Sequence, residues 1–91
     1  MSLMKHAGAA ALDQLEPLLA LIRTLPGLKE KGRGVFYRGG KAFLHFHEDP
    51  AGLFADVRLA GSEFDRFRVE TVEERDRFLA SLSAELKKGP V

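Results

Sequence analysis

Three side chains near the middle of the chain could bind a metal ion together. His45 and His47 are one residue apart, so on a β-strand both imidazoles point to the same side. Asp56 lies on the next predicted strand, and imidazole with carboxylate is a ligand set found around zinc, iron and nickel. The sequence therefore offers His45, His47 and Asp56 as a divalent-metal site. The alternative is two polar aromatic side chains on a half-exposed sheet face, hydrogen-bonded to Asp56 or to an arginine.

These side chains belong to residues 38–59, which form the centre of the predicted fold. Apolar and polar side chains alternate in residues 42–47 and again in residues 53–59, with the period of β-strands that have two different faces. Gly39-Gly40 suits a two-residue hairpin turn, and Pro50 prevents the ladder from continuing between the two strands. One face of this sheet is therefore expected to be aliphatic, and the other to carry aromatic rings, imidazoles and charge.

Two helices are predicted from their caps and their apolar periodicity. Asp13 can cap a first helix over residues 13–24, whose leucines and isoleucine share one face. Thr71 and Glu74 form a T-x-x-E capping box, the clearest local signal in the chain, and predict a second helix over residues 72–88. Both helices have an apolar face that must be buried against another element.

The remaining elements are four predicted strands in meander order, over residues 35–38, 42–47, 53–59 and 64–70. The order α-β-β-β-β-α predicts an α+β fold, a two-layer sandwich in which a four-stranded antiparallel sheet receives both helices on one face. Residues 29–34, KEKGRG, are expected to be a polar connector. Residues 1–12 are expected to be a flexible N-terminal segment, which leaves residues 13–91 as a single α+β domain.

The sheet face away from the helices is where a function is expected, because nothing in the predicted fold covers it. The side chains predicted on this face are Phe36, Arg38, Phe43, His45, His47, Phe54, Asp56, Arg58, Arg66 and Arg68. Three phenylalanines on an uncovered face predict a homodimer interface, in which a second copy hides the apolar area. Rings interleaved with arginines could also stack nucleic-acid bases, but the absence of an RNP-type motif and the net charge of +1 disfavour this reading.

Composition bounds the class of protein further. Ninety-one residues make one domain with a thin core, and the absence of cysteine agrees with a reducing cytoplasm. The 14 basic and 13 acidic residues give no overall electrostatic signature of nucleic-acid or membrane binding. The longest apolar run, residues 18–22, is far too short to span a bilayer. We therefore expect a cytoplasmic protein that does not enter a membrane.

Short motifs along residues 25–82 resemble a known family. They are LPGL, FYRGGKAFLHFH, GLFADVRL and FRVETVEER, in this order. The chain thereby resembles the uncharacterised bacterial "luciferase domain" family, whose label does not imply light emission and for which no reaction is known. The resemblance matches His45 and His47 to a His-x-His-like element of that family. It also implies a further histidine in a longer insert before the last strand, which residues 60–64 of this chain lack, so a site that needs this third imidazole is incomplete in this chain.

The G-K-x-F strand of residues 40–43 is similar to the YjbR-like α+β family, a likeness that implies nucleic-acid contact. Neither resemblance supplies a reaction, and the chain has no nucleophile elbow, Walker loop or Rossmann turn. We therefore expect a non-enzymatic binding or interaction module without a cofactor, which self-associates through its open sheet face. A small-molecule or divalent-metal-binding protein that uses His45, His47 and Asp56 is the first alternative, and a nucleic-acid-binding module is the second.

Overall fold

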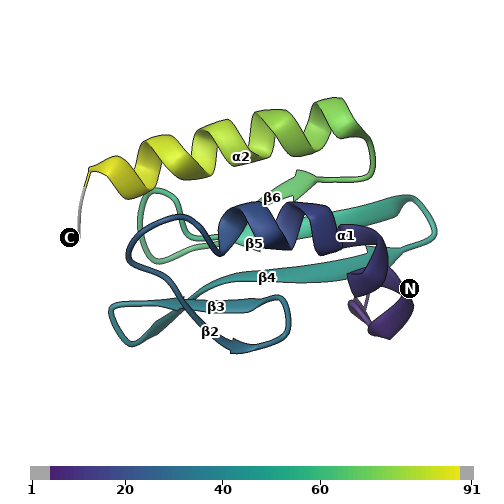
Figure 1. Cartoon of the computed structure of the whole chain (residues 1–91), viewed down its shortest axis with the longest axis horizontal. Helices are drawn as coiled ribbons and strands as arrows, with labels where there is room; N and C mark the ends of the chain where they lie inside the picture. The colour runs from purple at the N-terminus through teal and green to yellow at the C-terminus, as the bar shows by residue number, and fades with distance from the viewer. Residues whose placement is uncertain (1–4, 89–91) are drawn as a thin grey trace.

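The structure is a computed structural model that describes residues 5–88. Its elements are β1 (Lys5–His6), α1 (Ala9–Ile22), β2 (Lys29–Gly32), β3 (Val35–Arg38), β4 (Lys41–Asp49), β5 (Gly52–Val57), β6 (Asp65–Arg68) and α2 (Val72–Lys87). All strands belong to one antiparallel sheet with the order β2-β3-β4-β5-β6, and β1 pairs with β4 (Figure 1). The predicted α+β class is confirmed, whereas the predicted number of four strands is wrong, because residues 5–88 contain six.

The ladder between β4 and β5 is the centre of the sheet, as the alternating pattern predicts. Leu44 lies opposite Val57, and both side chains are buried in the core. The next pair, His45 and Asp56, points to the opposite face, because successive side chains of a strand alternate. The sheet therefore has one face that packs into the core and a second face that carries the polar side chains.

A register shift between β3 and β4 changes which phenylalanines face the core. Phe36 lies opposite Leu44, but the next residue, Tyr37, lies opposite Ala42, so that Phe43 is an extra residue on β4. A β-bulge of this kind breaks the strict alternation of side chains. Phe36 is 1% exposed and Phe43 is 4% exposed, and both belong to the hydrophobic core. The prediction that these two rings lie on the uncovered face is therefore wrong.

Two strands have no counterpart in the prediction. β2, with the sequence KEKG, pairs with β3 at the edge of the sheet, where charged side chains are typical and no alternating pattern is needed. The polar connector predicted at residues 29–34 is thus a strand and a turn. β1 has only two residues and pairs with β4. Residues 5–6 and 9–12, predicted as part of a flexible segment, therefore belong to β1 and α1, and residues 1–4 lie outside the described part of the chain.

Helix α1 begins at Ala9, four residues before the predicted start, and ends at Ile22. Gly8 is its N-cap and makes no side-chain cap, so the predicted capping role of Asp13 is wrong. Pro17 lies inside the helix, where its ring lacks an N–H group and crowds the carbonyl of the residue four positions earlier. In Figure 1 the N-terminal part of α1 runs at an angle to the rest of the helix, and a proline inside a helix is a common cause of such a bend.

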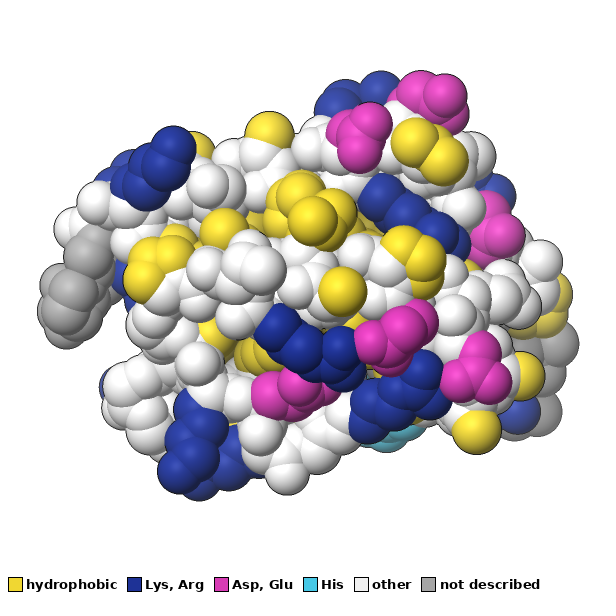
Figure 2. Space-filling view, in the orientation of Figure 1, with side chains coloured by type: hydrophobic (Ala, Val, Ile, Leu, Met, Phe, Trp, Pro, Cys, Tyr) yellow, Lys and Arg dark blue, Asp and Glu magenta, His cyan; other side chains and the backbone are white. Residues whose placement is uncertain are grey.

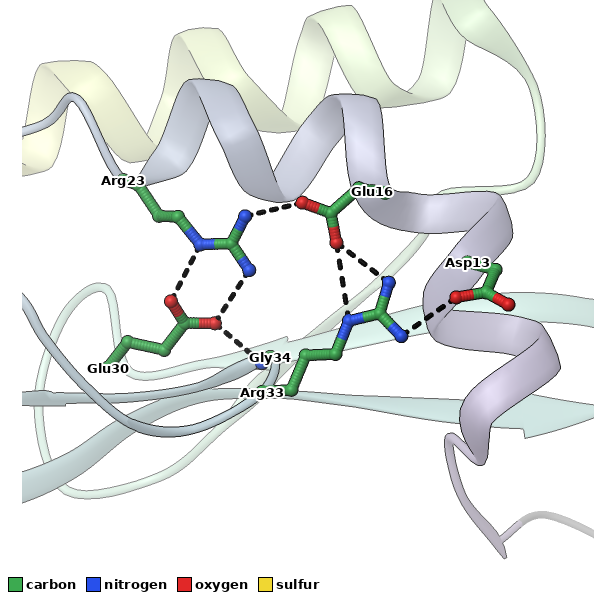
Figure 3. Close-up of polar contacts among 6 residues, drawn as sticks. All are labelled: Asp13, Glu16, Arg23, Glu30, Arg33 and Gly34. Carbon is green, nitrogen blue, oxygen red and sulfur yellow. Dashed lines mark hydrogen bonds and ion pairs between the residues drawn. The ribbon is translucent and has the colours of Figure 1, made fainter.

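An ion-pair network joins α1 to β2 and to the turn that follows it (Figure 3). Arg23 donates to Glu16 and, at 2.7 Å, to Glu30, while Arg33 donates at 2.8 Å to both Glu16 and Asp13. The arginine hydrogen bonds lower the pKa of Glu16 and of Glu30. Figure 2 shows dark blue and magenta side chains next to one another on this side of the molecule. Exposed ion pairs contribute little stability each. The network therefore mainly orients α1 on the β2–β3 hairpin.

Helix α2 begins at the predicted capping box. The Thr71 side chain accepts from the backbone N–H of Glu74 at 3.1 Å, and the Glu74 carboxylate accepts in return from the backbone N–H of Thr71 at 3.0 Å. The helix ends one residue before the predicted boundary. Phe78, Leu82 and Leu86 are its buried side chains and lie in the same core cluster as those of α1 and the sheet. The predicted start of α2 is therefore confirmed. It could be predicted because a capping box depends only on residues close in sequence.

One hydrophobic core contains buried side chains of both helices and of the sheet. The side chain of Arg75, on α2, donates to the backbone carbonyl of Gln14, on α1, at 3.3 Å, so the two helices are also linked to each other. Neither of the helices described in residues 5–88 is long and apolar enough to cross a membrane. The second face of the sheet, opposite this core, carries the candidate site.

Candidate functional site

His45, His47 and Asp56 lie together on the sheet face opposite the core. His45 and Asp56 are direct cross-strand partners, and His47 is two residues further along β4 on the same face. Nε2 of His45 lies 3.7 Å from Oδ2 of Asp56, and Nε2 of His47 lies 3.2 Å from the same oxygen. The potential ligand atoms of all three residues lie within 4.8 Å of one another. The sheet register thus brings the three residues predicted as metal ligands into one group.

The carboxylate of Asp56 is buried and held by Arg66. Its side chain is 8% exposed and accepts two hydrogen bonds, from Nε of Arg66 to Oδ1 at 2.7 Å and from Nη2 to Oδ2 at 2.8 Å. These charge-assisted bonds lower the pKa of Asp56, although burial alone would raise it. The carboxylate is therefore ionised at neutral pH. The Arg66 side chain is 51% exposed, so this ion pair opens onto solvent on one side.

Burial controls the charge of the two imidazoles. It is the largest cause that lowers the pKa of His45 and of His47, because a buried imidazolium loses its hydration. The neighbouring histidines and Arg66 lower both pKa values further, while the carboxylate of Asp56 acts in the opposite direction. Both rings are therefore neutral at neutral pH, which is the state in which an imidazole nitrogen can bind a metal ion.

One ring nitrogen of this group has no hydrogen-bond partner. Nε2 of His47 is fully buried, and although Asp56 is 3.2 Å away, the two groups are not aligned for a hydrogen bond. A neutral imidazole carries its proton on one of its two nitrogens. With the proton on Nδ1, Nε2 of His47 presents its lone pair beside a carboxylate oxygen of Asp56. Two buried acceptors at this distance repel each other unless a proton or a cation lies between them.

Two further rings adjoin the group and were not among the predicted site residues. His6, on β1, lies opposite His47 in the ladder, with ring centroids 4.7 Å apart. Phe64 packs edge-on against His45 at 4.8 Å. The alternation of Phe64 with Arg66 on one side of a strand could have indicated its place on this face. No spacing in the sequence indicates the place of His6, because it depends on the pairing of β1 with β4.

The other residues predicted on this face are spread along the sheet. Phe54 is half-buried and lies opposite His47. Arg68 lies opposite Phe54, but its guanidinium group turns to the carboxylate of Glu74, at 3.0 Å, and to the backbone of the β4–β5 turn. Arg58 donates to backbone carbonyls at the end of the sheet, and its guanidinium group lies 4.2 Å from the ring of Phe64. Within residues 5–88, the guanidinium groups of Arg58 and Arg68 are thus held by groups other than Asp56.

Three of the predicted residues lie elsewhere. Phe36 and Phe43 are in the core, and Arg38 lies over the ring of Phe43 and 3.6 Å from Glu85 of α2. The polar face of the sheet therefore has less apolar surface than predicted, because Phe54 and Phe64 are the phenylalanines that lie beside its polar groups. Self-association is predicted from three phenylalanines on this face, and base stacking from the same rings interleaved with four arginines. Both stay predictions, now with a smaller apolar basis.

Comparison with protein-family models, with curated proteins and with solved structures finds no match for this chain. The resemblance to the "luciferase domain" and YjbR-like families therefore stays a prediction.

Proposed function

We propose that this protein binds a divalent transition-metal ion, with zinc as the reference ion, through Nε2 of His45, Nε2 of His47 and the carboxylate of Asp56. The observation that carries the proposal is the buried, unpartnered Nε2 of His47, 3.2 Å from a carboxylate oxygen. A cation between these two acceptors would replace their repulsion with two coordinate bonds. The donors, two imidazoles and one carboxylate, suit zinc, nickel and iron better than calcium or magnesium.

The separations within the group are close to those around a tetrahedral ion. With bonds of about 2.0 to 2.1 Å, two ligand atoms of a zinc ion are roughly 3.3 Å apart. The distances from Asp56 Oδ2 to the two imidazole nitrogens are 3.2 Å and 3.7 Å. The widest separation of ligand atoms in the group is at most 4.8 Å, so the rings have to rotate to bring all three ligand atoms to the spacing around one ion.

The charges of the three groups also favour a cation. At neutral pH the lowered pKa values leave Asp56 ionised and both imidazoles neutral, so no proton has to be expelled before a metal ion binds. Arg66 acts in both directions, because it orients the carboxylate but also places a positive charge next to the site. Half of its side chain is exposed, and it can turn towards solvent when a metal ion binds.

We propose a two-layer sandwich with both helices on one face, which leaves the other face for ligand binding in a non-enzymatic module of the bacterial cytoplasm. Self-association through the same face is the alternative function, and the exposed ring of Phe64, at 36%, is what supports it. Small-molecule binding at the metal and nucleic-acid binding remain further alternatives, and neither has a specific contact in its favour.

The test is a titration of EDTA-treated protein with Zn²⁺, followed by isothermal calorimetry. We expect one ion per chain for the wild type and a loss of at least about tenfold in affinity for Asp56→Asn, which keeps the shape but removes the charge. Asp65→Asn, on the exposed start of β6, is the matched control and should bind like the wild type. Circular dichroism confirms that both variants are folded. Absence of Zn²⁺ binding by the wild type, or equal affinities of the two variants, would refute the proposal.

A further inference from the structure

All three histidines of the chain lie in one cluster, although they come from two separate segments. His6 is on β1, and His45 and His47 are on β4. The ring centroid of His6 lies 4.7 Å from that of His47 and 5.7 Å from that of His45, and the last two are 4.8 Å apart. The third ring therefore contacts both imidazoles of the metal site proposed above. A zinc site with His45, His47 and Asp56 has one tetrahedral position left for another ligand.

The pairing of β1 with β4 places His6 next to the proposed metal site. His6 lies directly opposite His47, so their Cβ atoms are cross-strand neighbours on the same face of the sheet. The ring of His6 is exposed, and rotation about its side-chain bonds is not blocked by burial in the core. Its nitrogens lie outside the group of ligand atoms that are within 4.8 Å of one another, so such a rotation is required for coordination.

The strand that carries His6 is held by few contacts. β1 has two residues, and beyond its ladder the amide of Ala7 donates to the carbonyl of Phe46 at 3.1 Å. The amide of Gly8 donates to the carboxylate of Glu48 at 2.7 Å. A two-residue strand at the surface is marginal by itself, so one additional bond between β1 and β4 changes how firmly it is held.

We propose that His6 is a third imidazole ligand of the metal ion, so that metal binding fixes β1 against β4. This inference rests on the proposed function and adds to it the identity of the fourth ligand and a structural consequence. The site then joins two segments that are about 40 residues apart in sequence, and the position of the N-terminal strand depends on the metal ion.

Two measurements on the full chain test the inference, both with Zn²⁺ as the probe. The first is Zn²⁺ affinity by calorimetry for His6→Gln, which removes the imidazole from an exposed strand and leaves the core intact. We expect a loss of at least about tenfold, because removal of even an indirect partner of a metal ligand costs that much. Lys5→Gln, on the same short strand, is the matched control and should keep the wild-type affinity, since the Lys5 side chain is 73% exposed and its Nζ lies 3.9 Å from Oε1 of Glu48.

The second measurement is hydrogen exchange at the amides of Ala7 and Gly8, which report on the attachment of β1. In the wild type, Zn²⁺ should slow exchange at both amides, and in His6→Gln it should not. His47→Gln serves as the reference for loss of the site itself.

The outcomes separate this inference from the proposed function. Binding that is lost in His47→Gln but unchanged in His6→Gln would overturn the inference and leave the metal site in place. Weaker binding by His6→Gln with wild-type protection of the two amides by Zn²⁺ would also overturn it, because β1 would then be fixed in another way. No Zn²⁺ binding by the wild type would refute both.

Discussion

Replacement of Phe43 by alanine tests the side-chain register on which the candidate site depends. With strict alternation along β4, Phe43 would lie on the polar face together with His45 and His47. In the structure the bulge between β3 and β4 turns its ring into the core, where the side chain is 4% exposed and Arg38 lies over it. The two arrangements predict very different costs for the same substitution.

The magnitude follows from the burial of the ring. A phenylalanine buries about 150 to 250 Å², which corresponds to about 4 to 6 kcal/mol at about 25 cal/mol per Å² and agrees with the roughly 3 to 5 kcal/mol of measured Phe→Ala series. A domain of this size has a total free energy of unfolding of roughly 5 to 14 kcal/mol. Phe43→Ala is therefore expected to remove a large part of the stability. Phe54→Ala, at a half-buried position on the polar face, should cost only about 1 to 2 kcal/mol.

Urea denaturation followed by circular dichroism measures both substitutions on one scale. If Phe43→Ala does not fold, Phe43→Leu keeps most of the volume and is expected to cost about 1 to 2 kcal/mol. The decisive comparison is with Phe54→Ala. A cost for Phe43→Ala no greater than that of Phe54→Ala would show that the ring is on the polar face and that the bulge is absent. The assignment of side chains to the two faces would then have to be redrawn.

Three further predictions concern local features of the fold. Thr71→Ala should lower the free energy of unfolding by about 1 kcal/mol, since it removes the cap of α2, and an unchanged urea midpoint would contradict this. Gly34→Ala should lower the free energy of unfolding more than Gly40→Ala in the same assay. Both glycines have φ near +80°, but a Cβ at Gly34 would lie 2.8 Å from a leucine side chain of α1, whereas nothing lies within 4 Å of a Cβ at Gly40. Equal decreases for the two variants would refute the close contact between Gly34 and α1. In EDTA-treated protein, the free energy of unfolding should be highest above the ordinary histidine pKa of 6.5 and should decrease as the pH falls below it. The reason is that the unfolded chain then takes up protons that the folded His45 and His47, with their lowered pKa values, do not. A free energy of unfolding that increases on acidification from pH 6.5 would show that burial does not control the charge of these imidazoles.

Much of the candidate site was predictable because its residues are close in sequence or share a simple period. His45 and His47 are on the same face of any strand, and the alternating run that contains Asp56 placed it on the neighbouring strand. Arg66 was placed on the same face by the same rule, although its bidentate contact with Asp56 depends on the register of β5 with β6. The site residues of β4, β5 and β6 therefore follow from local alternation.

The rest of the site depends on contacts between distant segments. His6 joins the cluster only because β1 pairs with β4, and two residues carry too little pattern to predict a strand. The same holds for β2, whose charged sequence resembles a loop until the neighbouring strand pairs with it. Strand pairing is a property of two segments at once, so the sequence of one of them does not reveal it.

By itself the sequence determined the start of α2, the central hairpin and the polar face around His45. Each of these is set by neighbours a few residues away, through a capping box, a turn or a period of two. Only the tertiary structure decided that Phe36 and Phe43 belong to the core and that His6 meets His47. A bulge shifts the period by one residue, and its position is set by how well the rings pack into the core rather than by the residues beside it.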